Sequence, residues 1–70
     1  MEEKIKKLKI GEFYIFTDNR RKFYKDIRIL KTEWGYILTL VGIVHSLKSY
    51  RKRCCYSIEQ VKYKIEKMII

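Results

Sequence analysis

The nine-residue run YILTLVGIV, Tyr36 to Val44, limits the fold of this chain more than any other feature. Apolar residues occupy both alternating sets of positions, which is typical of a central strand covered on both faces. The run is too short to cross a membrane, because a spanning helix needs about 20 apolar residues. We therefore predict a buried β-strand here, in which Gly42 marks a bulge or the close approach of another backbone segment.

Three further segments are predicted to be strands that accompany this run. KIGEFYIF (9–16) and KFYKDIRIL (22–30) contain aromatic and β-branched residues in alternation. In the second segment the alternation places Phe23 and Ile27 together on a buried face, opposite a face in solvent. RKRCCY (51–56) is predicted to be the fourth strand. Turn-forming residues separate these segments, so the expected sheet is an antiparallel meander.

A helix is predicted after the last strand. Ser57 and Gln60 have the spacing of a capping box, in which each side chain bonds the backbone at the start of a helix. Apolar residues then recur on one helical face: Ile58, Val61, Ile65, Met68 and Ile69. A fifth strand is the alternative, because Val61, Tyr63 and Ile65 also alternate. The cap and the apolar stripe together favour the helix.

The composition indicates one small basic domain. The chain has 70 residues, enough for a single core, and 17 Lys and Arg against 8 Asp and Glu give a net charge of +9. Such an excess favours an anionic partner, either nucleic acid or an acidic protein surface. The first ten residues, MEEKIKKLKI, lack the apolar run of a secretory leader, so we expect a cytoplasmic protein. No strongly basic amphipathic helix is present, and no membrane partner is predicted.

Two clusters of cations are predicted to converge. In an antiparallel meander the first and third hairpin loops lie at the same end of the sheet. The first loop holds Arg20, Arg21 and Lys22, and the third holds Lys48, Arg51, Lys52 and Arg53. Tyr24 and Tyr50 lie beside these charges. Cations neutralise phosphates and aromatic rings stack on unpaired bases, so these loops with Tyr50 are the predicted binding site.

The remaining reactive residues predict no catalytic or metal site. Cys54 and Cys55 are adjacent, so on a strand they point to opposite faces, and only His45 could join them as a ligand. We expect one cysteine in the core, one near the surface, and no cofactor. Glycine-rich phosphate loops and nucleophile elbows are absent from the sequence, so an enzyme is not predicted. Trp34 is expected to fill the core beneath a turn.

LKIGEFYIF followed by KDIRILKTEWGYILTLVG resembles the small Src-homology-3-like barrels, including the Tudor and KOW-type domains, over about residues 8–45. RKRCCYSIEQVKYKIEKM also looks like the end of many short phage and mobile-element proteins. The resemblance implies a binding module and transfers no site residue. The predicted fold is α+β: a small antiparallel sheet or Src-homology-3-like barrel of four to five strands with a C-terminal helix. A single domain spans 1–70, with a charged lead-in (1–8), strands (9–56) and the helix (58–69).

The predicted function is that of a non-enzymatic module that binds nucleic acid through the two basic hairpin loops. The alternative is a viral or plasmid-encoded inhibitor of a host protein, such as a nucleic-acid-handling defence complex, in the manner of anti-CRISPR proteins. A meander also leaves two sheet edges that can pair with another chain, so a homodimer is a further prediction.

Overall fold

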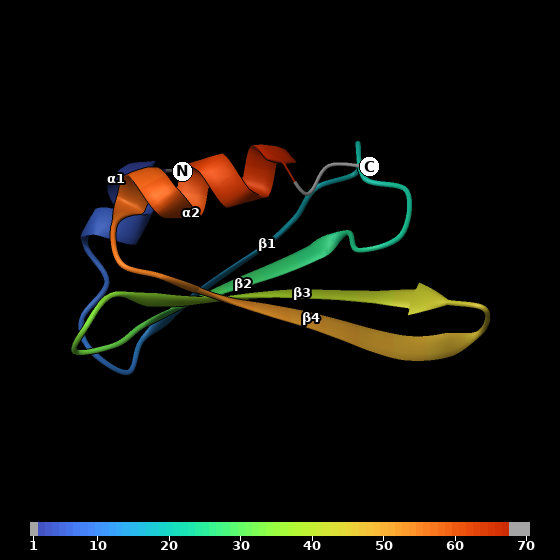
Figure 1. Cartoon of the computed structure of the whole chain (residues 1–70), viewed down its shortest axis with the longest axis horizontal. Coiled ribbons are helices and arrows are strands. Elements are labelled where there is room, and N and C mark those ends of the chain that lie inside the picture. Colours follow the sequence, from blue (N-terminus) through green and yellow to red (C-terminus); the bar gives the residue numbers. More distant parts are fainter. Residues whose placement is uncertain (1, 68–70) are drawn as a thin grey trace.

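The computed structural model describes residues 2–67, which form two short helices and one sheet (Figure 1). The elements are α1 (Glu2–Lys6), β1 (Phe13–Thr17), β2 (Asp26–Lys31), β3 (Tyr36–Val44), β4 (Leu47–Cys55) and α2 (Ile58–Lys67). All neighbouring strands are antiparallel, in the order β1-β2-β3-β4, so β1 and β4 are the edges of an open sheet. The predicted α+β fold with an antiparallel sheet and a C-terminal helix is confirmed.

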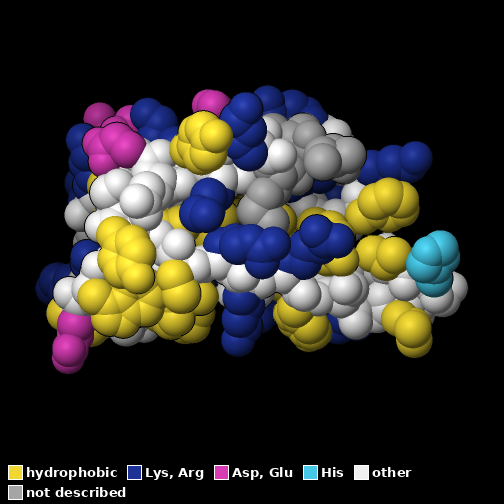
Figure 2. All heavy atoms as spheres, in the orientation of Figure 1, with side chains coloured by type: hydrophobic (Ala, Val, Ile, Leu, Met, Phe, Trp, Pro, Cys, Tyr) yellow, Lys and Arg dark blue, Asp and Glu magenta, His cyan; other side chains and the backbone are white. Residues whose placement is uncertain are grey.

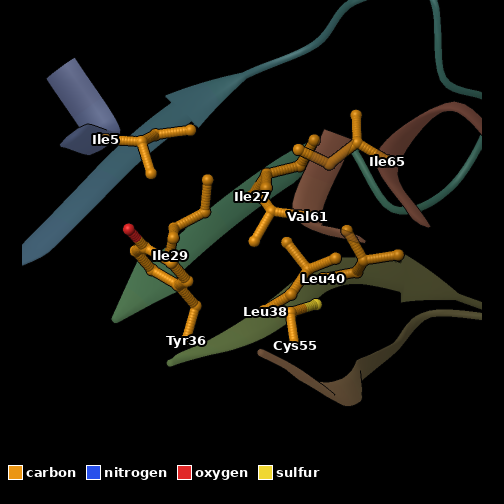
Figure 3. Packing of buried hydrophobic residues seen from close by; sticks show 9 residues of the cluster. All are labelled: Ile5, Ile27, Ile29, Tyr36, Leu38, Leu40, Cys55, Val61 and Ile65. Carbon is orange, nitrogen blue, oxygen red and sulfur yellow. The ribbon is translucent and has the colours of Figure 1, made fainter. Parts of the chain in front are cut away.

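Both helices cover the same face of the sheet, and the core lies between the two layers (Figures 1 and 3). The buried cluster takes its residues from α1, β2, β3, the end of β4, and α2: Ile5, Ile27, Ile29, Tyr36, Leu38, Leu40, Cys55, Val61 and Ile65. Ile5 is fully buried, so the segment predicted to be a charged lead-in also supplies a core residue. Lys62 Nζ lies 3.3 Å from the Glu2 carboxylate and joins α2 to α1.

The prediction that β3 is covered on both faces is wrong for one of them. Tyr36, Leu38 and Leu40 point toward the helices and are buried. On the other side Val41 is buried, but Ile37 is half-buried and Ile43 is exposed. The physical reason is that residues 2–67 supply one helical layer, which covers one face, and none for the second. This second side of the sheet is called the open face below.

Three predicted strands begin at other residues than expected. β1 begins at Phe13, not Lys9. β2 begins at Asp26, not Lys22, so Phe23 and Tyr24 lie in an eight-residue loop, 18–25. β4 begins at Leu47, because His45 and Ser46 close the β3–β4 hairpin with positive φ angles of 52° and 66°. The predicted third loop is therefore a strand. His45 and Ser46 are not the Asn-Gly or Gly-rich residues that usually indicate such a turn, which explains the error.

The predicted helix is confirmed, and its cap has one of the two hydrogen bonds of a capping box; the second comes from Tyr56 N, one residue before Ser57. Gln60 N donates to Ser57 Oγ at 3.2 Å, and Gln60 Oε1 accepts from Tyr56 N at 2.7 Å. Val61 and Ile65 are buried on the predicted apolar face, while Met68 and Ile69 lie outside the described residues. No helix within residues 2–67 is long and apolar enough to span a membrane.

Trp34 does not fill the core. Its side chain is 47% exposed and lies against Tyr56, with 5.7 Å between the ring centroids. The next aromatic residue along the chain, Tyr36, is the one that is buried. The turn before Tyr36 packs tightly against the end of β4. It leaves no room for a side chain at Gly35, where a Cβ would collide with the Cys55 carbonyl.

Candidate nucleic-acid interface

Loop 18–25 is held in shape by its first residue. Asp18 N donates to Lys25 O at 2.8 Å, which closes the loop, and Arg21 N donates to Asp18 O at 3.2 Å. The Asp18 carboxylate accepts hydrogen bonds from Arg20 N, Nε and Nη2 at 3.0–3.1 Å. These bonds from Arg20 lower the pKa of Asp18 to about 2, so the carboxylate is ionised at neutral pH.

Arg21 ties this loop to α2. Its side chain is buried, with 2% of the residue exposed, and Nη2 donates to the Ile65 carbonyl at 2.6 Å. Ile65 lies in the last turn of α2, where carbonyls lack intrahelical donors. Arg21 Nε also lies 3.8 Å from Asp18 Oδ2. The prediction that Arg21 contacts a partner is therefore wrong, because the core side of the loop encloses it.

Gly42 allows the same loop to cross the sheet. A Cβ at this position would collide with the Phe23 carbonyl and lie 2.9 Å from Tyr24 Cα, so the predicted close backbone approach is confirmed. Tyr24 Oη is 2.9 Å from Ser49 Oγ, and the Arg51 guanidinium lies 5.1 Å from the centre of the Tyr24 ring. These contacts of Tyr24 hold the loop against β4.

The result is a hollow of about 400 Å³ between this loop, the end of α2, and β4. We call it the basic groove; its walls are Lys22, Phe23, Tyr24, Arg51, Arg53 and Lys67, and Leu40 also lines it. Among the residues that the structure describes, none that lines it carries a carboxylate. Figure 2 shows Lys and Arg side chains as a band between the helix layer and the sheet, with the Asp and Glu side chains of this view away from it. The potential in the groove is therefore positive.

The aromatic rings of the groove lie beside cations. Lys22 Nζ is 5.4 Å from the centre of the Phe23 ring, which is 46% exposed. Hydrogen bonds from Ser49, and then from Arg51, lower the pKa of the Tyr24 hydroxyl by stabilising its phenolate. These contacts fix the rings while leaving part of the surface open to a ligand.

The structure brings together only some of the residues predicted for the site. Lys22 lines the basic groove together with Arg51 and Arg53. Both arginines point to the helix side of the sheet because they pair with Leu40 and Leu38 of β3. The remaining β4 residues of the prediction, Lys48, Tyr50 and Lys52, alternate onto the open face. Arg20 is exposed and bonded to Asp18, outside the basic groove.

Lys67 is the groove cation that the sequence prediction missed. It stands at the end of α2, and only the packing of that helix across the sheet brings it to β4. Its amine lies 5.6 Å from the centre of the Tyr63 ring, one helical turn earlier. A basic last helical turn was visible in the sequence, but its position relative to the strands was not.

The cysteines occupy the predicted positions. Cys55 is buried and Cys54 is exposed, and burial raises the pKa of the Cys55 thiol. Within residues 2–67, no group of three or more His, Cys, Asp or Glu side chains is placed to hold a metal ion.

Comparison of the chain with protein-family models, curated proteins and solved structures found no match. A function for the chain is therefore inferred from its own geometry and chemistry.

Proposed function

We propose that this chain is a small non-enzymatic module that binds nucleic acid through the basic groove. The observation that carries the proposal is the lining of the groove: residues 2–67 contribute four cations and two aromatic rings to it and no carboxylate. Lys and Arg bind phosphates and release the counterions that surround them. Aromatic rings stack on bases of any sequence. A positive groove with both features suits a polyanion that carries planar bases.

The proposal predicts a measurable dependence on salt. Each neutralised phosphate contributes about −0.7 for single strands, or about −0.9 for duplex, to the slope of log K against log salt concentration. Engagement of all four groove cations, Lys22, Arg51, Arg53 and Lys67, corresponds to a slope of about −3. Binding should therefore be strong at low salt and weaken steeply as salt is added.

The direct test compares two triple variants of equal charge. Lys22→Gln with Arg51→Gln and Arg53→Gln removes three groove cations. The control replaces Lys7, Lys9 and Lys25 by Gln, since all three are exposed and lie outside the groove. Labelled RNA and DNA are titrated with each protein across a salt series. We expect the groove variant to lose affinity and about two units of slope on single strands, and the control to lose much less.

Absence of nucleic-acid binding by the parent chain at low salt would contradict the proposal. Equal losses in the groove variant and the control would also contradict it, because they would indicate attraction by net charge alone.

One observation favours a second candidate function. The β3–β4 hairpin extends past the end of α2, and its tip exposes Ile43 and Leu47 (Figure 1). A protruding apolar tip suits insertion into a protein, as in a viral or plasmid-encoded inhibitor of a host nucleic-acid-handling complex. This alternative predicts a stable protein partner that is lost on Ile43→Ser and Leu47→Ser, together with weak affinity for free nucleic acid. Affinity capture from host lysate with mass spectrometry distinguishes the two.

A further inference from the structure

The open face carries a second hollow that the basic groove does not use. Its volume is about 490 Å³, and its walls include Phe13, Arg28, Leu30, Ile37, Tyr50 and Lys52. The two aromatic residues are 58% and 51% exposed, respectively. The described part of the chain contributes no carboxylate to this hollow either. It combines flat apolar rings with two cations on a surface that no helix covers.

β4 joins the two hollows. Because side chains alternate along a strand, Arg51 and Arg53 line the basic groove, while Tyr50 and Lys52 line the open-face hollow. β4 is also an edge of the four-stranded sheet. Cations therefore follow one another around this edge, from one side of the sheet to the other.

We infer that the open-face hollow is a base-stacking platform for single-stranded nucleic acid whose backbone passes around β4 from the basic groove. The inference rests on the proposed function. The rings of Phe13 and Tyr50 offer stacking surfaces that only unpaired bases can reach. Lys48 Nζ lies 5.7 Å from the centre of the Tyr50 ring and adds a cation beside it.

A duplex does not fit this path. Double-stranded DNA has a persistence length of about 150 base pairs, so a turn around the edge of a sheet layer about 10 Å thick would cost far more than the bends that proteins usually impose on DNA. A single strand is flexible enough to turn around such an edge. The arrangement therefore selects single-stranded over double-stranded nucleic acid, while the basic groove alone can attract either.

A second copy of the chain is a poorer occupant of the open face. Arg28, Lys48 and Lys52 all project from it, so two such faces would bring like charges together. Asp26 is the one carboxylate among the strand residues on this side, and it accepts a hydrogen bond from Thr17 Oγ1 at 2.8 Å. Charge therefore favours a polyanion over self-association.

The test measures fluorescence anisotropy with labelled oligothymidylates of 4–16 nucleotides and with a duplex of matched length. Phe13→Ala and Tyr50→Ala should each weaken single-strand binding by about 5- to 150-fold, and should change duplex binding less than about twofold. Tyr50→Phe keeps the ring and should retain affinity. Trp34→Ala removes a comparably exposed ring outside both hollows and should have no effect.

Photocrosslinking gives a readout that does not depend on variants. Oligonucleotides that carry 5-bromouracil should crosslink to the peptides that contain Phe13 or Tyr50. Crosslinks confined to the basic groove would overturn the inference.

The outcomes separate the two proposals. Unchanged single-strand binding by Phe13→Ala and Tyr50→Ala, in a parent whose binding depends on the groove cations, overturns the open-face platform and leaves the proposed function standing. Equal losses on single strand and duplex also overturn it. If the parent chain binds no nucleic acid, both proposals are contradicted. A dimer that Tyr50→Ala dissociates, measured by analytical ultracentrifugation, would assign the face to a second copy instead.

Discussion

The two faces of the sheet are built from the same strands but have different roles. On the helix side Leu38 and Leu40 are buried. Two residues after Leu40, the backbone of loop 18–25 packs directly against Gly42. On the open face, Ile37 of the central strand β3 and Tyr50 of the edge strand β4 stay accessible to solvent. The comparison indicates that one layer of helix is enough to stabilise this small domain. Much of the second face is left accessible to solvent.

The largest contrast is expected from a pair of neighbouring residues in β3. Leu38→Ala opens a cavity in the core and should lower the free energy of unfolding by about 2–5 kcal/mol. Ile37→Ala, on the half-buried open face, should cost about 1 kcal/mol or less. Urea denaturation followed by circular dichroism measures both. Similar losses would mean that the open face is covered in solution.

Adjacent arginines provide the second contrast, between the two sides of loop 18–25. Arg21→Met removes a charged hydrogen bond to the Ile65 carbonyl and should cost about 1.5–3 kcal/mol of unfolding free energy. Arg20→Met removes an ion pair in which the arginine is exposed, and it should cost much less because solvent screens that pair. Urea denaturation of the two variants compares them directly. Equal costs would contradict the anchoring role of Arg21.

A pair of glycines tests whether the loop builds the groove. Gly42→Ala should push Phe23 and Tyr24 off the sheet, cost about 1–3 kcal/mol and abolish binding by the basic groove. Gly11→Ala is strained by its φ of +90° and should cost about 1–2 kcal/mol, but it contacts nothing in the groove. Denaturation together with anisotropy titrations separates lost stability from lost binding. Retained affinity in Gly42→Ala would show that the loop is dispensable.

The smallest effect is a dependence of stability on pH. The pKa of Asp18 is about 2 in the folded chain, against 3.8 when unperturbed, so the unfolded state binds more protons between these values. Its contribution to stability is complete above about pH 4 and is lost as the pH falls through about 2. Asp18→Asn should flatten this part of the stability curve, measured by denaturation at a series of pH values. An unchanged curve would contradict the ionised, bonded state of Asp18.

Local signals in the chain were enough to predict much of the fold. The capping pair Ser57 and Gln60 marked the start of α2, because both hydrogen bonds of the cap join residues no more than four positions apart in the sequence. Alternation predicted that one of the two adjacent cysteines is buried and the other exposed; the buried one is Cys55. Gly42 in an apolar strand predicted a close backbone approach, although the approaching segment was not identified.

The site was harder to predict because its parts are far apart in sequence. Lys22 and Arg53 were identified, but the loop predicted around Arg53 is a strand, and strand alternation divides its cations between two faces. Lys67 reaches the groove only through the packing of α2. Phe13 was read as a strand residue without a role, since nothing local says which face of the sheet lacks a cover.

The sequence by itself determined the elements, the strand order and the basic charge, because propensity, capping and alternation act over a few residues. Tertiary structure decided which cations line the same groove, that Arg21 is buried, and which aromatic rings remain exposed to solvent. The physical reason is that these properties depend on where the single helical layer lies. Its position is set by the packing of Ile5, Val61 and Ile65 onto the sheet, over distances that no local pattern records.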